Sequence, residues 1–442
     1  MKQILPQAAQ VLERLEAAGY EGYLVGGCVR DLLLGRIPAD WDMTTSARPE
    51  DVLALFEGFA LPTGLQHGTV TVRLDGASFE VTTYRVDGTY GDHRHPDSVS
   101  FTGDLSEDLR RRDFTVNAMA MDRRGHVVDP LGGQADLRRG VIRAVGDPAR
   151  RFSEDALRIL RAVRFSAALG FPVEAETDRA VHAMAGQLRA VAAERIRTEL
   201  LKLICGADAA RVLLAYPDVI GVFLPEILPA VGCDQKNYHH CYDVWEHTAR
   251  ALGAVKAESV LRMTMLLHDL GKPGCMTLDE AGVGHFKGHA AASCALAAIA
   301  LRRLRFDNAS AERILTLVKW HDVTIEPTRR AVRRLMNKLG AEAAAQLLQV
   351  KRADNLAQAP AYRGRQQEID VLEGLLQELI AEDACFSLKQ LAVNGRDLLA
   401  LGCAGREVGQ ALDFLLREVL EERLPNEKAA LLAALDRERR NK

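Results

Sequence analysis

The chain has 442 residues, of which 26% are charged and 48% are hydrophobic, and its formal net charge is −3. This length predicts several domains, and the near-neutral charge excludes a uniformly basic protein that coats nucleic acid. The sequence has no run of about 18 apolar residues that would predict a membrane span, and its eight cysteines form no CxxC pair, so we expect a cytoplasmic protein with reduced thiols and no membrane partner.

The N-terminal part of the chain predicts short helices and strands around a pair of glycines, Gly26-Gly27. Glycines at such a turn let backbone N–H groups approach a phosphate closely, and the start of a helix adds a positive dipole there. In chain order we predict a helix over 4–18, a strand over 22–25, a helix over 28–34, a strand over 40–44, and a hairpin of strands over 69–74 and 77–82 that turns at Asp75-Gly76.

Three carboxylates in these elements are predicted to hold metal ions. Asp40 and Asp42 are two residues apart on a predicted strand, so their side chains point to the same face. Glu80 lies on the polar face of the hairpin. A pair of Mg²⁺ ions needs several carboxylate oxygens to activate an attacking hydroxyl and to stabilise a leaving pyrophosphate. Asp40, Asp42 and Glu80 are therefore the predicted catalytic and Mg²⁺-binding residues of a phosphoryl or nucleotidyl transferase.

Four segments then resemble, in order, the motifs of the class II tRNA nucleotidyltransferase family, which comprises CCA-adding enzymes and bacterial poly(A) polymerases. The first runs from Gly26 to Asp42, and the others cover 111–119, 154–161 and 194–199. The resemblance implies an α+β fold, in which a polymerase β-like head with a small mixed sheet precedes an all-α neck, body and tail. Among the members, the chain looks closest to bacterial CCA-adding enzymes with an HD domain.

The same resemblance, together with prolines at plausible boundaries, predicts the domain organisation. Residues 1–140 are expected to form the nucleotidyltransferase head, 141–225 a helical neck with the base-reading motif, 226–368 an HD domain, and 369–442 a helical tail that contacts tRNA.

The motifs also imply which residues bind the nucleotide. Gly27 and Arg30 are expected to lie where pyrophosphate leaves. By resemblance, Arg112 meets the triphosphate and Asp113 meets a ribose hydroxyl. Their order along the chain is that of the family.

Base selection is assigned to Asp155 and Arg158, which are three residues apart and share a face of a helix predicted over 154–168. A carboxylate beside a guanidinium offers an acceptor and donors side by side, as a base edge does. In the family this pair accepts cytosine or adenine and rejects guanine and uracil. Arg161 and Arg164 continue the stripe toward the phosphates.

A long polar loop is predicted over 87–107, and it has the length that the resemblance links to switching from CTP to ATP. This disfavours an enzyme that adds only CC. A basic stretch over 302–338, with ten Lys and Arg against four Asp and Glu, fits either a phosphate-backbone footprint or solvated helix faces.

A second constellation of histidines and aspartates resembles the HD phosphohydrolase metal site. Imidazole and carboxylate ligands suit a divalent ion such as Mn²⁺, Ni²⁺ or Mg²⁺. HD folds of this family also serve as structural platforms for tRNA, so hydrolysis stays open. His239 and His240 precede the region and either line the same pocket or lie at the surface. The six predicted ligands are His247, His268, Asp269, His289, His321 and Asp354.

The predicted function is template-independent addition or repair of the 3′-terminal CCA of tRNA, with CTP and ATP as substrates and pyrophosphate as product. The expected partners are the tRNA 3′ end, ATP and CTP, without an obligate protein partner. Two alternatives remain at this point. One is an A-adding enzyme of a split system or a poly(A) polymerase, and the other is an HD phosphohydrolase, as a second or main function, that acts on 2′,3′-cyclic or monophosphate ends.

Overall fold

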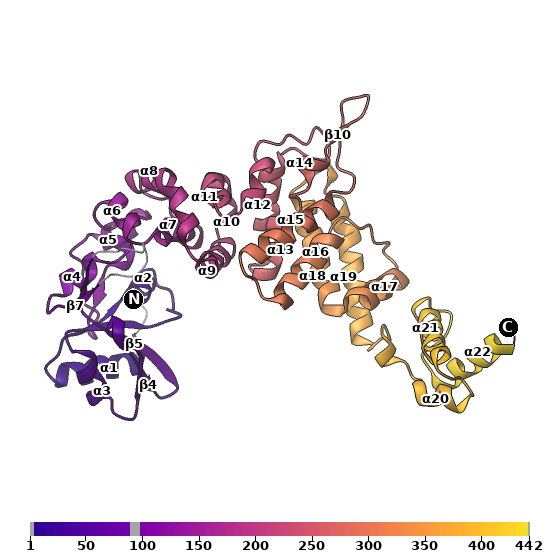
Figure 1. Ribbon diagram of the computed structural model, residues 1–442, viewed down its shortest axis with the longest axis horizontal. Coiled ribbons are helices and arrows are strands. Elements are labelled where there is room, and N and C mark those ends of the chain that lie inside the picture. Colours follow the sequence, from indigo (N-terminus) through magenta and orange to yellow (C-terminus); the bar gives the residue numbers. More distant parts are fainter. Residues whose placement is uncertain (1–3, 89–97, 441–442) are drawn as a thin grey trace. The chain divides into compact units, whose positions relative to one another are not determined.

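The computed structural model describes residues 4–88 and 98–440 (Figure 1). Residues 89–97 of the loop predicted over 87–107 therefore lie outside the described residues, and the later part of that range is not all loop, since it holds a strand at Val99–Phe101 and the start of a helix at Leu105–Arg110. The chain divides into two units, Met1–Pro225 and Glu226–Lys442. No helix within the described residues is long and apolar enough to cross a membrane. All eight cysteines are free thiols.

The first unit contains a mixed sheet of seven strands in the order β3-β4-β5-β2-β1-β8-β9. The predicted hairpin is confirmed, and its turn residues Asp75 and Gly76 both have positive φ, 47° and 80°, as the turn type requires. The strands are β1 (Gly22–Val25), β2 (Asp42–Thr45), β3 (Ala60–Gly64), β4 (Thr69–Leu74), β5 (Ala77–Thr83), β8 (Ala120–Met121) and β9 (Val127–Val128), and a separate pair is formed by β6 (Arg85–Asp87) and β7 (Val99–Phe101).

Helices accompany this sheet, and the α+β class is confirmed. Helix α1 buries Ala8, Val11, Leu12 and Leu15, which recur at the helical spacing that predicted it. Helix α2 begins directly after β1, at the glycine pair. The helices of this part are α1 (Pro6–Ala17), α2 (Gly27–Leu33), α3 (Pro49–Leu55), α4 (Leu105–Arg110) and α5 (Gly133–Arg139), with a 3₁₀ turn η2 (Thr115–Asn117).

The rest of the first unit is helical, but the single helix predicted over 154–168 is wrong. One helix ends at Glu154, and Asp155 has extended backbone angles, φ −142° and ψ 105°. The next helix starts at Leu157, and its residue Ala167 accepts a hydrogen bond from the backbone of Asp208. The helices are α6 (Pro148–Glu154), α7 (Leu157–Leu169), α8 (Ala175–Met184), α9 (Ala193–Ile204), α10 (Ala209–Ala215) and α11 (Pro217–Gly221).

The second unit is almost wholly helical and has a short hairpin, β10 (Thr277–Leu278) and β11 (Gly284–His285). Its last three helices enclose a core of their own, in which Leu398, Leu415 and Leu431 are fully buried. The helices are α12 (Val244–Ala254), α13 (Ser259–Leu267), α14 (Lys272–Cys275), α15 (His289–Arg303), α16 (Asn308–Trp320), α17 (Arg329–Leu339), α18 (Ala341–Leu356), α19 (Arg365–Ala381), α20 (Gly395–Ala400), α21 (Arg406–Leu420) and α22 (Lys428–Arg440) (Figure 1).

The basic stretch over 302–338, which fits either a phosphate-backbone footprint or solvated helix faces, is partly neutralised within the chain. Four arginines of α17 face glutamates of α19 and of the segment after α21. Internal ion pairs therefore neutralise part of the positive charge of these arginines. The stretch has less positive charge available to bind phosphate groups than its composition implies. The pairs are Arg329 with Glu378, Glu382 and Glu422, Arg330 and Arg334 with Glu421, and Arg333 with Glu422.

Candidate functional site

A cleft of about 450 Å³ in the first unit gathers most of the predicted nucleotide-binding residues. Seven arginines line it, against three aspartates, so it favours a strongly anionic ligand. Its lining consists of Gly26, Gly27, Arg30, Asp42, Arg111, Arg112, Asp113, Asn117, Asp155, Leu157, Arg158, Arg161, Arg164, Phe165 and Arg195.

Strand pairing places the predicted metal carboxylates at the edge of this cleft. Strands β2 and β5 run parallel, and Asp42 is the register partner of Glu80. Partial desolvation, then the negative charge of Glu80, raises the pKa of Asp42; Arg112 opposes this rise and Asp40 adds to it. The carboxylates are therefore close enough to repel one another, and carboxylate oxygens suit a divalent cation. Of the three carboxylates only Asp42 lines the cleft, however, and among the described residues Asp40, Asp42 and Glu80 do not form a group whose ligand atoms all lie within 4.8 Å of one another.

The prediction that Asp40 and Asp42 share one face of a strand is wrong. Strand β2 begins only at Asp42, and Asp40 lies in the bend before it. Alternation along one strand therefore does not bring the two together. The stronger relationship, between Asp42 and Glu80, comes from a parallel pairing of strands far apart in the sequence.

The glycine turn lies against this carboxylate. Gly26 has φ of 75°, and a Cβ at this position would lie 3.5 Å from the Arg112 guanidinium and 3.8 Å from Asp42 Oδ2. Both distances are ordinary van der Waals contacts, so the positive φ alone is what favours glycine at this position. Arg30, one turn into α2, is held by hydrogen bonds to Asn117 at 2.8 Å and to Asp31 at 2.9 Å.

Asp113 is buried and fully occupied by internal partners. Its Oδ2 accepts hydrogen bonds from Arg161 at 2.8 and 2.5 Å, and its Oδ1 accepts from the backbone N–H of Phe114 at 2.8 Å. Burial alone would raise the pKa of Asp113, but the Arg161 guanidinium outweighs burial and lowers the pKa to about 2. The carboxylate is thus ionised in a fixed orientation.

Asp155 and Arg158 both line the cleft, but their side chains do not bond to each other; the backbone N–H of Arg158 donates to the carbonyl oxygen of Asp155 at 2.9 Å. Asp155 accepts hydrogen bonds from Arg195 at 2.8 and 3.3 Å. Arg158 donates to Glu154 at 2.6 Å and to the carbonyl oxygens of Arg151 and Arg111 at 3.0 and 3.2 Å. The helix break at Asp155 explains the difference, because it turns the carboxylate away from the face that Arg158 occupies. The segment 194–199 resembled a family motif, but sequence reasoning gave Arg195 no role.

Arg161 and Arg164 meet at Glu199 and Phe165. Arg164 donates to Glu199 at 2.8 Å, and its guanidinium lies 3.5 Å from the centroid of the Phe165 ring. Burial lowers the pKa of Arg164, and Glu199 opposes this change. Phe165 forms an aromatic wall of the cleft that sequence reasoning missed, since a phenylalanine at helical spacing reads as core.

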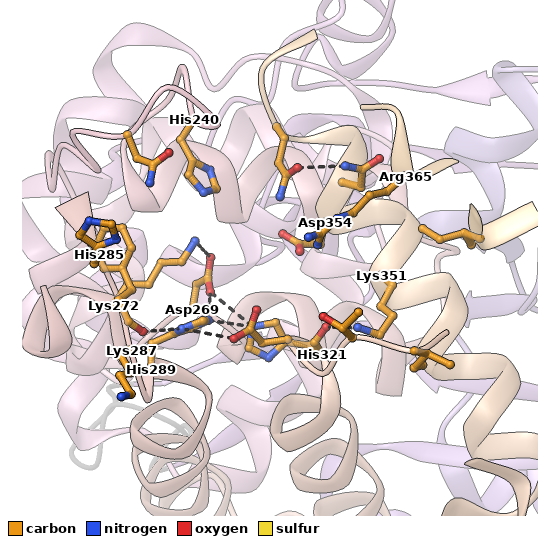
Figure 2. A pocket seen from close by; sticks show the side chains of 18 of the residues that line it. His240, Asp269, Lys272, His285, Lys287, His289, His321, Lys351, Asp354 and Arg365 are labelled. Carbon is orange, nitrogen blue, oxygen red and sulfur yellow. Dashed lines mark hydrogen bonds and ion pairs between the residues drawn. The ribbon is translucent and has the colours of Figure 1, made fainter. Parts of the chain in front are cut away.

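The second unit has a pocket of about 430 Å³ that is lined by four of the six predicted HD ligands, Asp269, His289, His321 and Asp354, while His247 and His268 are fully buried and do not line it (Figure 2). The side chains of the six form two groups that share Asp269, and within each group the ligand atoms lie within 4.8 Å of one another. The first group is His247, His268, Asp269 and Asp354, and the second is Asp269, His289 and His321.

All four histidines present the same ring nitrogen to the centre. In each, Nδ1 lies within hydrogen-bond distance of a backbone carbonyl oxygen, so Nδ1 donates and Nε2 faces the carboxylates. A carbonyl that fixes the ring in this way is the usual outer partner of a metal-binding histidine. The pairs are His247 with Ala357 at 3.3 Å, His268 with Met265 at 2.7 Å, His289 with Phe286 at 2.9 Å and His321 with Val318 at 2.6 Å.

The buried atoms at this centre lack hydrogen-bond partners. His268 Nε2 and both carboxylate oxygens of Asp269 meet the geometry of no hydrogen bond, although Asp269 Oδ2 forms an ion pair with Lys272 Nζ at 2.7 Å and lies 3.2 Å from His268 Nε2. Burial disfavours the protonated form of His268, but Asp269 and then Asp354 outweigh it and raise the pKa of His268 to about 10. A positive charge is thus favoured where these side chains converge, and a divalent cation fits that requirement.

Comparisons with known proteins agree with this architecture. Family models match for the poly(A) polymerase head domain over residues 22–143, the RNA- and SrmB-binding site of polymerase A over 170–230, and the tRNA nucleotidyltransferase domain 2 over 291–435. A CCA-adding enzyme of Geobacillus stearothermophilus is 41% identical over 293 residues, which cover 64% of this chain and 70% of that relative. One of Leuconostoc mesenteroides is 50% identical over 226 residues, or 50% of this chain.

The chain spans only about half the length of several curated relatives that it matches, 56% in the Leuconostoc protein. Solved structures extend the likeness. The Bacillus stearothermophilus CCA-adding enzyme in complex with CTP is 33% identical, with a TM-score of 0.75 and 99% of both chains covered. A Thermotoga maritima CCA-adding enzyme in complex with tRNA shares the fold, at 20% identity and a TM-score of 0.57.

Proposed function

Because the chain belongs to the family of CCA-adding enzymes, we propose that it adds or repairs the 3′-terminal CCA of tRNA without a nucleic-acid template. CTP and ATP are the proposed substrates, and pyrophosphate is the product. The observation that carries this proposal is the register pairing of Asp42 with Glu80 beside a cleft lined by seven arginines.

Asp40, Asp42 and Glu80 are the proposed ligands of Mg²⁺ in the head. Bound there, Mg²⁺ would help to activate the tRNA 3′-hydroxyl and to neutralise the leaving pyrophosphate. The mutual repulsion that raises the pKa of Asp42 supports this assignment, since a cation would relieve it.

The chain's own residues position the reactants. The N–H groups at Gly27 and the Arg30 side chain bind the phosphates, and Arg112 adds a second guanidinium beside Asp42. Asp113 orients Arg161, so that its part at the ribose would be indirect unless the ion pair opens. Catalysis then consists largely of positioning and charge neutralisation.

Asp155 and Arg158 are the proposed readers of the base. Arg195 holds the Asp155 carboxylate, which is the hydrogen-bond acceptor, and Glu154 holds the Arg158 guanidinium, which is the donor. Both groups are therefore preorganised at the cleft. Arg158 keeps guanidinium N–H groups for a base edge, because three hydrogen bonds, to Glu154 and to the carbonyl oxygens of Arg151 and Arg111, use only three of its five donors. Arg161 and Arg164 supply positive charge next to the same site.

The decisive experiment supplies tRNAs that end before the first C, after one C and after CC. Each is incubated with labelled CTP and with ATP separately, and the products are sized. Stepwise completion to CCA supports the proposal. Addition of A alone, or growth of a long A tail, would instead support the A-adding enzyme or the poly(A) polymerase.

We propose the domain limits as predicted: a head over 1–140, a neck over 141–225, an HD domain over 226–368 and a tail over 369–442. The interrupted helix pair α6 and α7 carries the base-reading residues of the neck. The separate core under α20, α21 and α22 supports a tail with its own fold.

A second function is proposed for the pocket of the second unit, metal-dependent hydrolysis of a phosphoester. The uniform orientation of the four histidines and the atoms of His268 and Asp269 that form no hydrogen bond support it. Mn²⁺, Ni²⁺ or Mg²⁺ held there would polarise a phosphoryl oxygen and lower the pKa of a bound water. Lys287, Lys351 and Arg365 line the pocket and would bind phosphate (Figure 2).

Metal analysis of the purified protein, together with hydrolysis assays on a 2′,3′-cyclic nucleotide and on a phosphomonoester, tests this second function. His268→Ala and Asp269→Ala are expected to lose the metal and the hydrolysis while CCA addition persists. Hydrolysis that survives both substitutions would contradict the assignment.

A further inference from the structure

An exposed aromatic cluster stands in the second unit, and we call it the aromatic rim: Tyr238, His239 and Tyr362. The Tyr238 ring centroid lies 4.5 Å from that of His239 and 5.5 Å from that of Tyr362, and the last two are 4.2 Å apart. Tyr238 is nevertheless 64% exposed. A large aromatic ring that other rings contact on one side, and that is exposed to solvent on the other, has a free π-face for a ligand.

The aromatic rim adjoins the pocket that holds the histidines and aspartates. Asn237 and His240, which flank the first two rim residues in the chain, line that pocket. Asn355 lines it as well, and its side-chain amide donates to the carbonyl oxygen of the third rim residue at 3.0 Å. The two segments that carry the rim therefore also contribute to the lining of the pocket, together with residues from 269–289 and 321–325.

The pocket and the rim offer complementary chemistry. Lys287, Lys351 and Arg365 place positive charge around the ligand-binding side chains of the pocket (Figure 2). Cations at a site of this kind select a phosphate group. Exposed aromatic rings stack with nucleobases of any sequence, because every base has a π-face. A molecule that carries both a phosphate and a base would satisfy both.

We infer that the aromatic rim stacks the base of a nucleoside phosphoester whose phosphate enters the histidine–aspartate pocket. This inference rests on the phosphoester hydrolysis proposed above, and it names the substrate class of that site. The chemistry is shared by a free mononucleotide and by an RNA 3′ end that carries a phosphate. Tyr238 and Tyr362 are then the residues that favour such esters over phosphates without a base.

Binding, measured by isothermal titration calorimetry with Mn²⁺ present, tests the inference. The ligands are AMP, a short oligoribonucleotide with a 3′-phosphate, and ribose 5-phosphate. All variants are made in the full-length chain with Asp155→Ala and Arg158→Ala, which weaken nucleotide binding in the head. Metal content is measured on each protein, so that loss of the metal and loss of stacking are told apart.

Tyr238→Leu is expected to weaken AMP or the oligoribonucleotide by about fivefold or more, the effect of losing one stacked base, and to leave ribose 5-phosphate unchanged. Tyr238→Phe keeps the ring and is expected to bind like the parent. Tyr242→Leu is the matched control, because the Arg250 guanidinium already covers that ring at 4.1 Å. Preference for AMP over the oligoribonucleotide, or the reverse, identifies the source of the nucleotide.

Equal affinity of the parent protein for AMP and ribose 5-phosphate, with metal bound, would overturn the stacking and leave the proposed hydrolysis standing. A parent protein that binds neither metal nor ribose 5-phosphate, but binds AMP through Tyr238, would support the rim and overturn the hydrolysis. Absence of all three kinds of binding would overturn both.

Discussion

The Asp155 carboxylate accepts two hydrogen bonds from Arg195, 40 residues further along the chain, and none from Arg158, three residues away. A bidentate pair of this kind fixes both the position and the plane of the carboxylate. The orientation of the proposed base reader therefore depends on the packing of α9 against the neck.

Arg195→Ala is accordingly expected to relax nucleotide choice. Without the two hydrogen bonds from Arg195, the Asp155 carboxylate is no longer held in one plane. We therefore expect kcat/KM for CTP and ATP to fall by about tenfold or more, and incorporation of UTP or GTP to rise relative to that of CTP and ATP. Single-nucleotide incorporation measures both, on a tRNA that ends before the first C for CTP and on a tRNA that ends in CC for ATP, with UTP and GTP offered to each. Lys202→Ala, on the exposed side of α9, is the control. An unchanged ratio of correct to incorrect nucleotides would contradict the positioning role.

Asp42→Asn keeps the shape of the side chain and removes its charge. Incorporation is expected to fall at least about a hundredfold, since the proposed metal loses a ligand, while tRNA binding persists. Asp75→Asn is the matched control, because asparagine tolerates the positive φ of that hairpin turn. Activity within a few fold of the parent would remove Asp42 from the catalytic set.

The same substitution has a consequence for the metal-free protein. The pKa of Asp42 is raised, so ionisation of this carboxylate costs folding free energy once the pH exceeds that pKa. Asp42→Asn is therefore expected to raise the melting temperature in EDTA at neutral pH, and to lose that advantage under acid conditions. A lower melting temperature at neutral pH would show that the carboxylates do not repel one another.

Asp113 predicts a different pH dependence. Its pKa is lowered to about 2, so its ion pair with Arg161 stabilises the fold above the ordinary aspartate pKa near 4 and is lost as the pH falls toward 2. The difference in unfolding free energy between the parent and Asp113→Asn is expected to shrink by about 1 kcal/mol between pH 5 and pH 3, which is about half of the change across the whole window. Urea unfolding at pH 5 and at pH 3, followed by a probe in the first unit, measures it. A difference that does not change with pH would contradict an ionised, paired Asp113.

The shared position of Asp269 predicts how metal content responds to mutation. Asp269→Asn is expected to abolish metal retention, because Asp269 belongs to both ligand groups, whereas His289→Ala removes a ligand from one group only. Plasma mass spectrometry of proteins dialysed against limiting Mn²⁺ gives the stoichiometry. Asp279→Asn, which alters an exposed aspartate that pairs with His285 at 2.9 Å, is the control. Equal metal loss in Asp269→Asn and in the control would exclude the site.

Local patterns predicted the hairpin, the helix over α1 and the position of the glycine turn, since each depends on residues close in sequence. The break at Asp155 had no such signal. The segment around it contains neither glycine nor proline, and the break accompanies a tertiary ion pair with Arg195. Sequence spacing therefore predicted that Asp155 acts beside Arg158. In the structure Asp155 instead forms an ion pair with Arg195, and Arg158 forms one with Glu154.

The pairing of Asp42 with Glu80 likewise depends on a parallel contact between β2 and β5 that no local rule predicts. The six histidine and aspartate ligands were found from sequence because the resemblance fixed their order, and the structure brings their side chains into two adjoining groups. The aromatic rim was not found, since Tyr238 and Tyr362 are far apart in the chain and meet only where two loops converge.

Three of the pocket histidines donate to a carbonyl only three residues earlier in the chain, in His268, His289 and His321. The orientation of these three rings is thus set by carbonyl groups close in sequence at their own helix ends, and it depends neither on a bound ion nor on distant parts of the fold. His247 differs, because its carbonyl partner, Ala357, lies 110 residues away. An ion can consequently leave and another can enter while three of the rings keep their direction, so exchange of one metal for another does not require the unit to refold.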